Sequence, residues 1–194
     1  MDKEKIEIIR RINKQIVRAD GTIESFDKQI IKLMSGVFDT KYPMVIADNS
    51  NSLKYIKNYN TNNPLIINVS TVIKVREKHD IGYEFVSECE NYLRNSVLAF
   101  TSLSFESSNV IVLNEFDDEG DPIVAICRMD KDTGGNVFVN EITSIYDKQK
   151  LCELITKTYN RNKTIYKNEK TENYFKSLGF YFPQGLKYAL SSEY

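Results

Sequence analysis

The sequence predicts an α+β fold, in which an N-terminal helical hairpin packs on a domain of helices and an antiparallel sheet. Three observations predict it. Apolar residues recur at helical spacing near the N-terminus, the period changes to two from Val97 onward, and acidic or glycine-rich turns separate the runs that follow. Consecutive hairpins favour an antiparallel meander of four or five strands over a doubly wound parallel sheet.

Two helices are predicted at the N-terminus. Isoleucines at spacings of three, three and four predict an amphipathic helix over residues 3–18, stopped by Asp20-Gly21. Ser25 is expected to be the N-cap of a second helix that ends near Gly36. This pair is too small to form a core alone, so it must pack on the rest of the chain or on a partner. We therefore expect a helical extension at 1–41 and an α+β domain at 42–194.

The next segment mixes short strands and helices. Strands are predicted at 43–47 and 65–69, the first of them closed by the polar turn 48–52. Residues 70–79 either continue the second strand or form a short helix. A longer helix is predicted over 82–95, where apolar residues share one face.

From Val97 onward, four β-rich runs follow one another: 97–103, 109–116, 122–129 and 136–146. Hairpin turns are expected at 117–121 and 130–135, which are rich in aspartate and glycine. The remaining elements are a helix over 148–160, a short strand at 164–166 and a helix over 169–178. These predictions complete the α+β pattern.

The composition is that of an ordinary soluble protein, with 41% hydrophobic and 27% charged residues. The longest apolar runs are far shorter than the roughly 20 residues of a membrane span, and no secretory signal is recognisable. Three widely spaced cysteines without a CxxC motif suit a reducing compartment and supply too few ligands for a metal site. We therefore expect a cytoplasmic protein, with no membrane contact and no metal.

The net charge of −1 hides an uneven distribution along the chain. Residues 105–146 carry two basic and nine acidic groups, whereas residues 147–194 carry nine basic and five acidic groups. The chain is not basic enough to indicate nonspecific nucleic-acid binding by composition alone. The asymmetry is consistent with a basic lobe opposite an acidic one, or simply with two solvated faces.

Several familiar site types are absent from the sequence. It contains no GxxxxGK[ST], GxGxxG, GxSxG or HExxH motif, so no nucleotide or other cofactor is expected. The acidic turn at 117–121 lacks the spacing of an EF-hand and is expected to be a solvated hairpin tip. Cys89 and Cys127 lie on apolar faces of their predicted elements, which argues against a Cys–His nucleophile.

Two segments carry groups suited to acid–base and phosphate chemistry. The single histidine, His79, follows the basic run that contains Lys74 and Lys78. Histidine exchanges protons near neutral pH, and lysines neutralise phosphate, although a lone histidine beside lysines is more often a surface residue. On a regular strand, Asn140, Ile142, Ser144 and Tyr146 share one face, while Glu141, Thr143 and Ile145 share the other. Such a strand is either a plain edge or the floor of a polar site.

These two segments, with the stretches "SVLAFTSLSFESSNVIVLNEFDDEGDPIVAICRMD" and "VFVNEITSIYDKQ", resemble the phage MuF C-terminal domain. That group belongs with the phage and prophage barnase–EndoU–colicin–RelE-like nuclease domains. The closing stretch "TIYKNEKTENYFKSLGFYFPQGL" is also similar to the end of that domain. The resemblance covers roughly residues 64–186 and leaves out the N-terminal hairpin.

The resemblance implies a metal-independent ribonuclease site on one sheet face, where a 2′-hydroxyl attacks the adjacent phosphate. By this resemblance His79 is the acid or base, Lys74 and Lys78 bind phosphate, and Ser144, Tyr146 and Lys148 line the sheet side. EndoU-type enzymes use two histidines, whereas this chain has one. The second proton-transfer group is then expected to be Tyr146, a lysine or a carboxylate such as Glu141. If the site is formed, His79 lies within about 10 Å of the Ser144/Tyr146 face.

The expected function is that of a phage- or prophage-encoded ribonuclease-like domain that acts on RNA or binds it. The alternative is a non-catalytic interaction protein that uses the same fold to inhibit a host factor, such as a CRISPR-type bacterial defence complex. In that case the acidic 105–146 region imitates nucleic-acid charge against a basic partner. The expected partner is accordingly RNA or a host protein complex.

Overall fold

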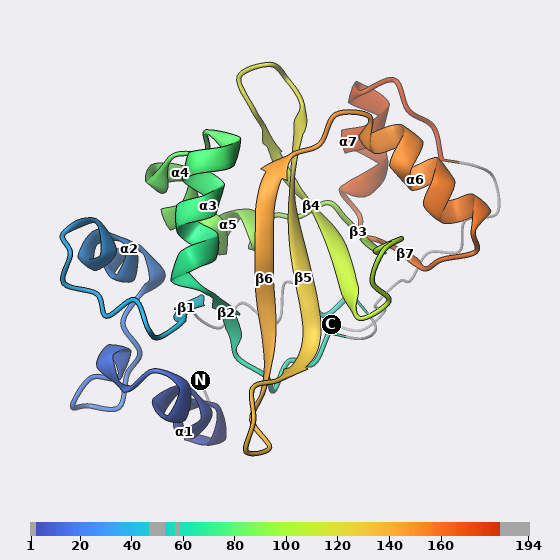
Figure 1. Cartoon of the computed structure of the whole chain (residues 1–194). Helices are drawn as coiled ribbons and strands as arrows, with labels where there is room; N and C mark the ends of the chain where they lie inside the picture. The colour runs from blue at the N-terminus through green and yellow to red at the C-terminus, as the bar shows by residue number, and fades with distance from the viewer. Residues whose placement is uncertain (1–2, 47–52, 57–58, 183–194) are drawn as a thin grey trace.

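A single mixed sheet organises the chain, with helices on both of its faces (Figure 1). The computed structural model describes residues 3–46, 53–56 and 59–182. Within these residues, seven strands lie in the order β1-β2-β6-β5-β4-β3-β7, and all neighbouring pairs are antiparallel except β2 and β6. The predicted α+β class is confirmed. The predicted four or five strands were too few, because short strands extend the central meander at both sides.

The N-terminal region folds as predicted, with an earlier break. Helix α1 (Lys3–Ile12) ends at Asn13, whose buried side chain donates to the Pro43 carbonyl at 2.8 Å and accepts from the Gln15 amide. A short 3₁₀ turn, η1 (Lys14–Ile16), follows, and α2 (Phe26–Met34) starts directly after Ser25. Ser25 makes no hydrogen bond from its side chain to the helix backbone. Ile9, Phe26 and Ile30 are buried in the same cluster as the sheet residues, so this region packs on the rest of the chain.

Strands β1 (Met44–Ile46) and β2 (Leu65–Ile67) form one side of the sheet. The polar turn predicted at 48–52 lies outside the described residues. In β1 only Val45 directs its amide and carbonyl away from β2, and both groups bond to the Gln29 side chain at 2.9 Å. The fully buried Gln29 side chain therefore connects α2 to the edge of the sheet through two hydrogen bonds.

Residues 70–79 form a helix rather than a continued strand. Helix α3 (Val69–His79) buries Val69, Val72 and Val75, a spacing of three that fits a helix and not a strand. It ends at Asp80, which adopts the left-handed conformation (φ 52°). The helix predicted over 82–95 is instead two helices, α4 (Tyr83–Ser87) and α5 (Cys89–Arg94), which are separated at Glu88.

The central meander matches the four predicted runs. Its strands are β3 (Leu98–Thr101), β4 (Ser108–Phe116), β5 (Pro122–Asp132) and β6 (Phe138–Asp147). The last elements are α6 (Leu151–Asn160), β7 (Ile165–Lys167) and α7 (Thr171–Ser177). Helices α6 and α7 cover the β3–β4 side of one sheet face, and Phe175 is buried there beside Phe100 and Val112.

A bulge in β6 overturns one prediction from the sequence. Ser144 pairs with Ile126, but the next β5 residue, Cys127, pairs with Ile142, so Thr143 has no partner on β5. Because paired residues share a face, the bulge reverses the alternation at this point. Ser144 and Tyr146 therefore share their face with Glu141. Asn140 and Ile142 lie on the opposite face, contrary to the strict period of two that we expected.

No helix among the described residues has both the length and the hydropathy needed to cross a membrane.

Candidate functional site

The open part of the sheet surface lies over β5 and β6, between α3 and the α6–α7 pair (Figure 1). Ile126, Ser144 and Tyr146 on this face are only half-buried, whereas the β3–β4 residues beside them are covered by α6 and α7. Strand β2 pairs with β6 only as far as Ile142. Beyond that point α3 contacts β6 in place of a strand, and this arrangement brings the end of α3 to the open face.

His79 and Tyr146 meet at this position. The centroids of their rings are 5.5 Å apart and the ring planes are inclined at 32°. The predicted proximity of less than about 10 Å is confirmed. His79 is the last residue of α3 and is half-buried, so its imidazole is held against a neighbour and still reaches solvent.

Lys148 joins the same cluster. Lys148 is two positions beyond Tyr146 in the sequence, and its Nζ lies 5.8 Å from the centroid of the Tyr146 ring. The backbone is fixed here by a hydrogen bond from the Lys148 amide to the Pro122 carbonyl at 2.7 Å. Three of the predicted site residues, from two distant segments, are thus brought together.

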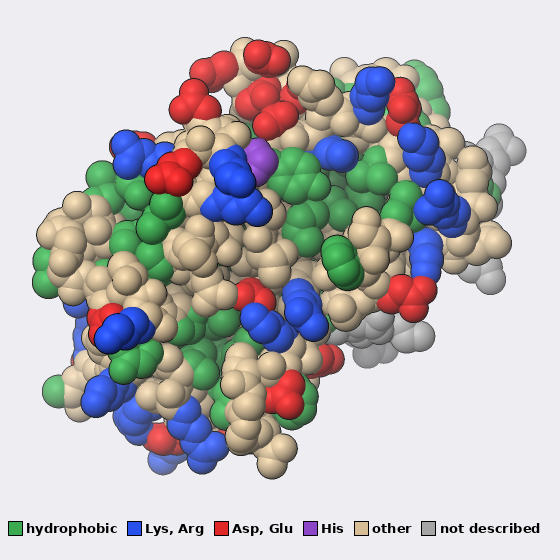
Figure 2. Space-filling view, in the orientation of Figure 1, with side chains coloured by type: hydrophobic (Ala, Val, Ile, Leu, Met, Phe, Trp, Pro, Cys, Tyr) green, Lys and Arg blue, Asp and Glu red, His purple; other side chains and the backbone are tan. Residues whose placement is uncertain are grey.

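Ser144 lies one strand repeat before Tyr146 on the same face, which places its hydroxyl roughly 7 Å along β6 from the Tyr146 position. Lys74 and Lys78 are exposed on α3, four residues apart and therefore on one side of the helix. Figure 2 shows Lys or Arg side chains over α3 next to the histidine, with hydrophobic side chains on its other side. Arg76 does not belong to this group, because its guanidinium stacks on Tyr83 at 4.8 Å.

The Tyr146 phenol is held in its protonated form. Burial raises its pKa, and the nearby negative charge of Asp147 raises it further. At neutral pH this side chain is consequently a hydrogen-bond donor rather than a base. The imidazole of His79 can both accept and donate a proton, so it is the group of the cluster suited to act as a base.

Glu141 shares the face of the cluster but lies too far along β6 to belong to it. It lies five residues before Tyr146, or roughly 16 Å along an extended strand. Its side chain is 5% exposed, pairs with Lys131 Nζ at 2.7 Å and accepts a hydrogen bond from Asn68 Nδ2. Among the groups considered from the sequence, Tyr146 and Lys148 therefore fit the second position next to His79, and Glu141 does not.

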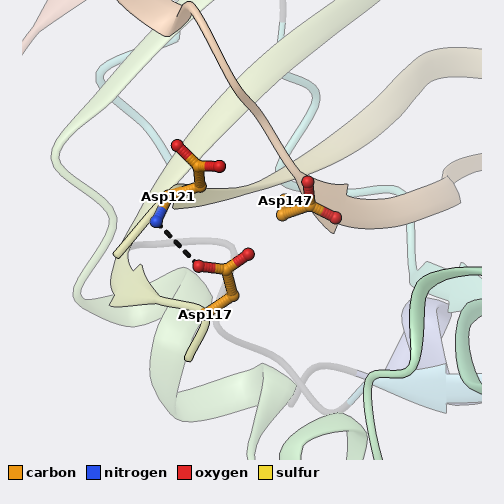
Figure 3. A group of neighbouring side chains, drawn as sticks. All are labelled: Asp117, Asp121 and Asp147. Atoms are coloured by element: carbon orange, nitrogen blue, oxygen red, sulfur yellow. Dashed lines mark hydrogen bonds between the residues drawn. The ribbon is translucent and has the colours of Figure 1, made fainter. Parts of the chain in front are cut away.

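Acidic side chains converge at one edge of the site. Carboxylate oxygens of Asp117, Asp121 and Asp147 lie within 4.8 Å of one another (Figure 3). An Asp117 oxygen accepts the amides of Glu119 at 3.0 Å and Asp121 at 2.7 Å, which is the capping expected of a hairpin tip. Asp147 joins this turn from the end of β6, a neighbour that the sequence of the turn alone does not indicate. Carboxylates that converge in this way do not by themselves make a metal site.

The cysteines do not contribute nucleophiles to the cluster. Cys89 and Cys127 are fully buried, and burial raises the pKa of both thiols, that of Cys89 to about 12. A thiol with such a pKa is not ionised at neutral pH. Their position on apolar faces agrees with the prediction from the sequence.

A comparison with protein-family models now bears on the identity of the chain. The model of the phage MuF-C-terminal domain matches residues 71–173, which is more than half of the sequence. The chain belongs to the phage MuF C-terminal domain family. No curated protein and no solved structure gives a significant match to it.

The MuF C-terminal match covers most of the sheet and the whole His79 cluster. It runs from α3 through α7 and includes His79, Tyr146 and Lys148, so the entire cluster lies within the family domain. Helices α1 and α2 and strands β1 and β2 precede the match. In this member of the MuF C-terminal family, the matched region therefore shares its sheet and its core with an N-terminal addition.

Proposed function

We propose that this MuF C-terminal domain is a metal-independent ribonuclease-like domain that binds RNA on the open β5–β6 face and cleaves it beside His79. The observation that carries the proposal is the contact between His79 and Tyr146, with Lys148 on the same ring. An imidazole, a protonated phenol and an ammonium group provide the base, the donor and the cation that phosphoryl transfer from a 2′-hydroxyl requires.

The proposed step balances with these groups alone. His79 accepts the proton of the 2′-hydroxyl as that oxygen bonds to the adjacent phosphorus. The bond from phosphorus to the 5′-oxygen breaks, a 2′,3′-cyclic phosphate remains, and the departing oxygen takes the proton of Tyr146, which the proton held by His79 later replaces through solvent. Lys148, with Lys74 or Lys78 from the rim of α3, neutralises the additional negative charge of the phosphorane.

The test uses purified protein and total RNA in the presence of EDTA. We expect wild-type protein to cleave RNA and leave cyclic phosphate ends, and the His79→Ala variant to be inactive. Glu77→Ala, an exposed substitution on the same helix, is the matched control and should retain activity. If neither the wild-type protein nor the control cleaves any RNA, the catalytic proposal is wrong.

A non-catalytic role is the second candidate, and the acidic cluster favours it. Asp117, Asp121 and Asp147 place three carboxylates beside the site, where they repel RNA but attract a basic protein surface. In this proposal the domain inhibits a host factor, such as a CRISPR-type defence complex, by imitating nucleic-acid charge. Two results together support it: the domain captures a basic nucleic-acid-binding host protein and cleaves no RNA. The Asp121→Lys/Asp147→Lys variant, which reverses two charges of the cluster, should lose this capture.

A further inference from the structure

A hollow opens on the described surface, away from the His79 cluster. It has a volume of about 350 Å³ and lies between α1, β2 and the β5–β6 hairpin. Its apolar walls are formed by Ile12, Pro43, Ile66 and Val137. Its polar lining comes from Arg11, Asn68, Lys131 and Thr133. Pockets of this size and mixed lining typically hold a small organic molecule or one unit of a larger ligand.

The hollow is built on an ion pair of which only the carboxylate is buried. Asn68 and Lys131, which both line it, bond to the carboxylate of Glu141, and Glu141 is 4% exposed. Burial of a carboxylate costs free energy that a nearby ammonium offsets only in part, so such a pair is a weak source of stability. It does provide fixed donors and acceptors at the wall of a pocket. With Arg11 at the exposed rim, the hollow has two cations against one carboxylate.

We propose that this hollow binds one nucleotide of an RNA chain, with the phosphate held by Arg11 and Lys131. The base then lies against Ile12, Ile66 and Val137, and its edge faces Asn68 and Thr133. A planar ring with polar edges suits apolar walls that carry amide and hydroxyl groups, and guanidinium and ammonium groups suit a phosphate. This inference rests on the proposed RNA binding and adds a subsite to it.

The position of the hollow supports a continuous path for RNA. The β6 bulge places Glu141 on the same face as Ser144 and Tyr146, so the hollow and the His79 cluster are two ends of one surface. They are separated by roughly 16 Å along the strand, which is several nucleotides at a stacked rise of about 3.4 Å. The bound nucleotide is therefore not the one that is cleaved.

The N-terminal addition completes the hollow. Arg11, Ile12 and Pro43 come from residues that precede the family match, whereas Lys131, Thr133 and Val137 lie within it. The subsite consequently belongs to this chain with its extension and not to the matched region alone.

The test compares two neighbouring arginines of α1 in the full chain. Arg11→Ala removes the cation at the rim, and Arg10→Ala removes an equal charge that lies beside Glu7 instead. The probes are a fluorescently labelled single-stranded RNA of twelve nucleotides and the four free nucleoside 5′-monophosphates. We expect Arg11→Ala to weaken RNA binding by roughly fivefold and Arg10→Ala by less than about twofold. Free monophosphates should shift the NMR amide signals of Thr133 and Gly134 in wild-type protein.

Each outcome has a definite meaning for the subsite. If both variants bind all probes equally, or if the monophosphates shift signals elsewhere, the subsite is wrong even when RNA is cleaved at His79. If monophosphates bind at Thr133 and Gly134 but no RNA is cleaved, the subsite stands and the catalytic proposal fails. Binding of the monophosphates without binding of the RNA assigns the hollow to free nucleotides and overturns its role on an RNA chain.

Discussion

The imidazole of His79 lies 5.5 Å from the ring of Tyr146 because β2 stops before β6 does. Had β2 continued past Ile67, a strand would separate the end of α3 from the C-terminal half of β6. The short β2 leaves this part of β6 to α3, and the last residue of the helix reaches the open face. The contact between the His79 and Tyr146 rings therefore depends on where β2 ends.

The first prediction concerns the hydroxyl of Tyr146. Tyr146→Phe keeps the ring against His79 and removes only the phenolic donor. If the domain cleaves RNA as proposed, we expect the rate to fall by roughly 10²- to 10⁴-fold, with little change in thermal stability. A cleavage assay at substrate saturation measures the effect, and Tyr159→Phe on α6 is the control. Full activity of the Tyr146→Phe variant would show that another group supplies the proton.

The second prediction concerns the charge next to this phenol. Asp147→Asn removes one of the two causes that raise the pKa of Tyr146, so that pKa should move down toward its usual value of 10.0. It should stay above that value because burial, the larger cause, is unchanged. NMR titration of ring-labelled tyrosine follows the shift, with the Tyr146→Phe spectrum used to assign the signal. An unchanged pKa contradicts the electrostatic explanation.

The third prediction is an asymmetry in the ion pair of the buried Glu141 and the partly exposed Lys131. Lys131→Met leaves a buried carboxylate whose remaining partner is Asn68, and we expect a loss of about 2–4 kcal/mol in the free energy of unfolding. Glu141→Gln leaves a lysine that is 31% exposed and can be hydrated, so the loss should be about 1 kcal/mol. Urea denaturation measures both. The double variant should be more stable than Lys131→Met, and an additive loss would contradict this account.

The fourth prediction concerns the fastening of α2 to the sheet edge. Gln29→Leu keeps the apolar volume but leaves the buried amide and carbonyl of Val45 without their partner. We expect a loss of about 2–3 kcal/mol and faster proteolysis of the N-terminal helices. Lys28→Ala, at an exposed position, should change stability by less than about 0.5 kcal/mol. Equal stability of the two variants would be inconsistent with the role of Gln29.

The fifth prediction is a loss of stability at alkaline pH. Burial raises the pKa of the Cys89 thiol and of the Tyr55 phenol to about 12, from usual values of 9.0 and 10.0. Above pH 9 the unfolded chain loses these protons while the folded chain keeps them, so the unfolded state binds fewer protons. The free energy of unfolding therefore falls as pH rises from 9 toward 12, by up to about 1.4 kcal/mol per pH unit for each group. Cys89→Ala should flatten this slope in urea denaturation measured across the range.

Much of the fold could be predicted from the sequence because the meander is local. Between Val97 and Tyr146 each strand pairs with the next, and aspartates and glycines mark the turns that follow β4 and β5. The pairing of β2 with β6 could not be predicted in the same way. It joins segments that are distant in the sequence, and three apolar residues do not indicate their neighbour. Helix α3 was ambiguous because its β-branched residues favour a strand locally, and tertiary packing decided for the helix.

The candidate site, like the fold, could be predicted from the sequence only in part. His79 and Tyr146 were singled out by residue type and by resemblance, and the structure places them in contact. The face of Glu141 was predicted incorrectly, since a period of two assumes that no residue is bulged. The pairs that Glu141 forms with Lys131 and Asn68 had no signal in the sequence.

The parallel pairing of β2 with β6 also has a consequence for synthesis of the chain. Ile67 of β2 leaves the ribosome long before its partner Ile142, which is 75 residues further on. At about 5–20 residues per second, about 4–15 seconds pass between the synthesis of β2 and the synthesis of its partner strand β6. During this interval α1 and α2 have nothing of the sheet to cover except β1 and β2 themselves. The N-terminal addition is therefore synthesised before β6, the strand of the family domain with which β2 pairs.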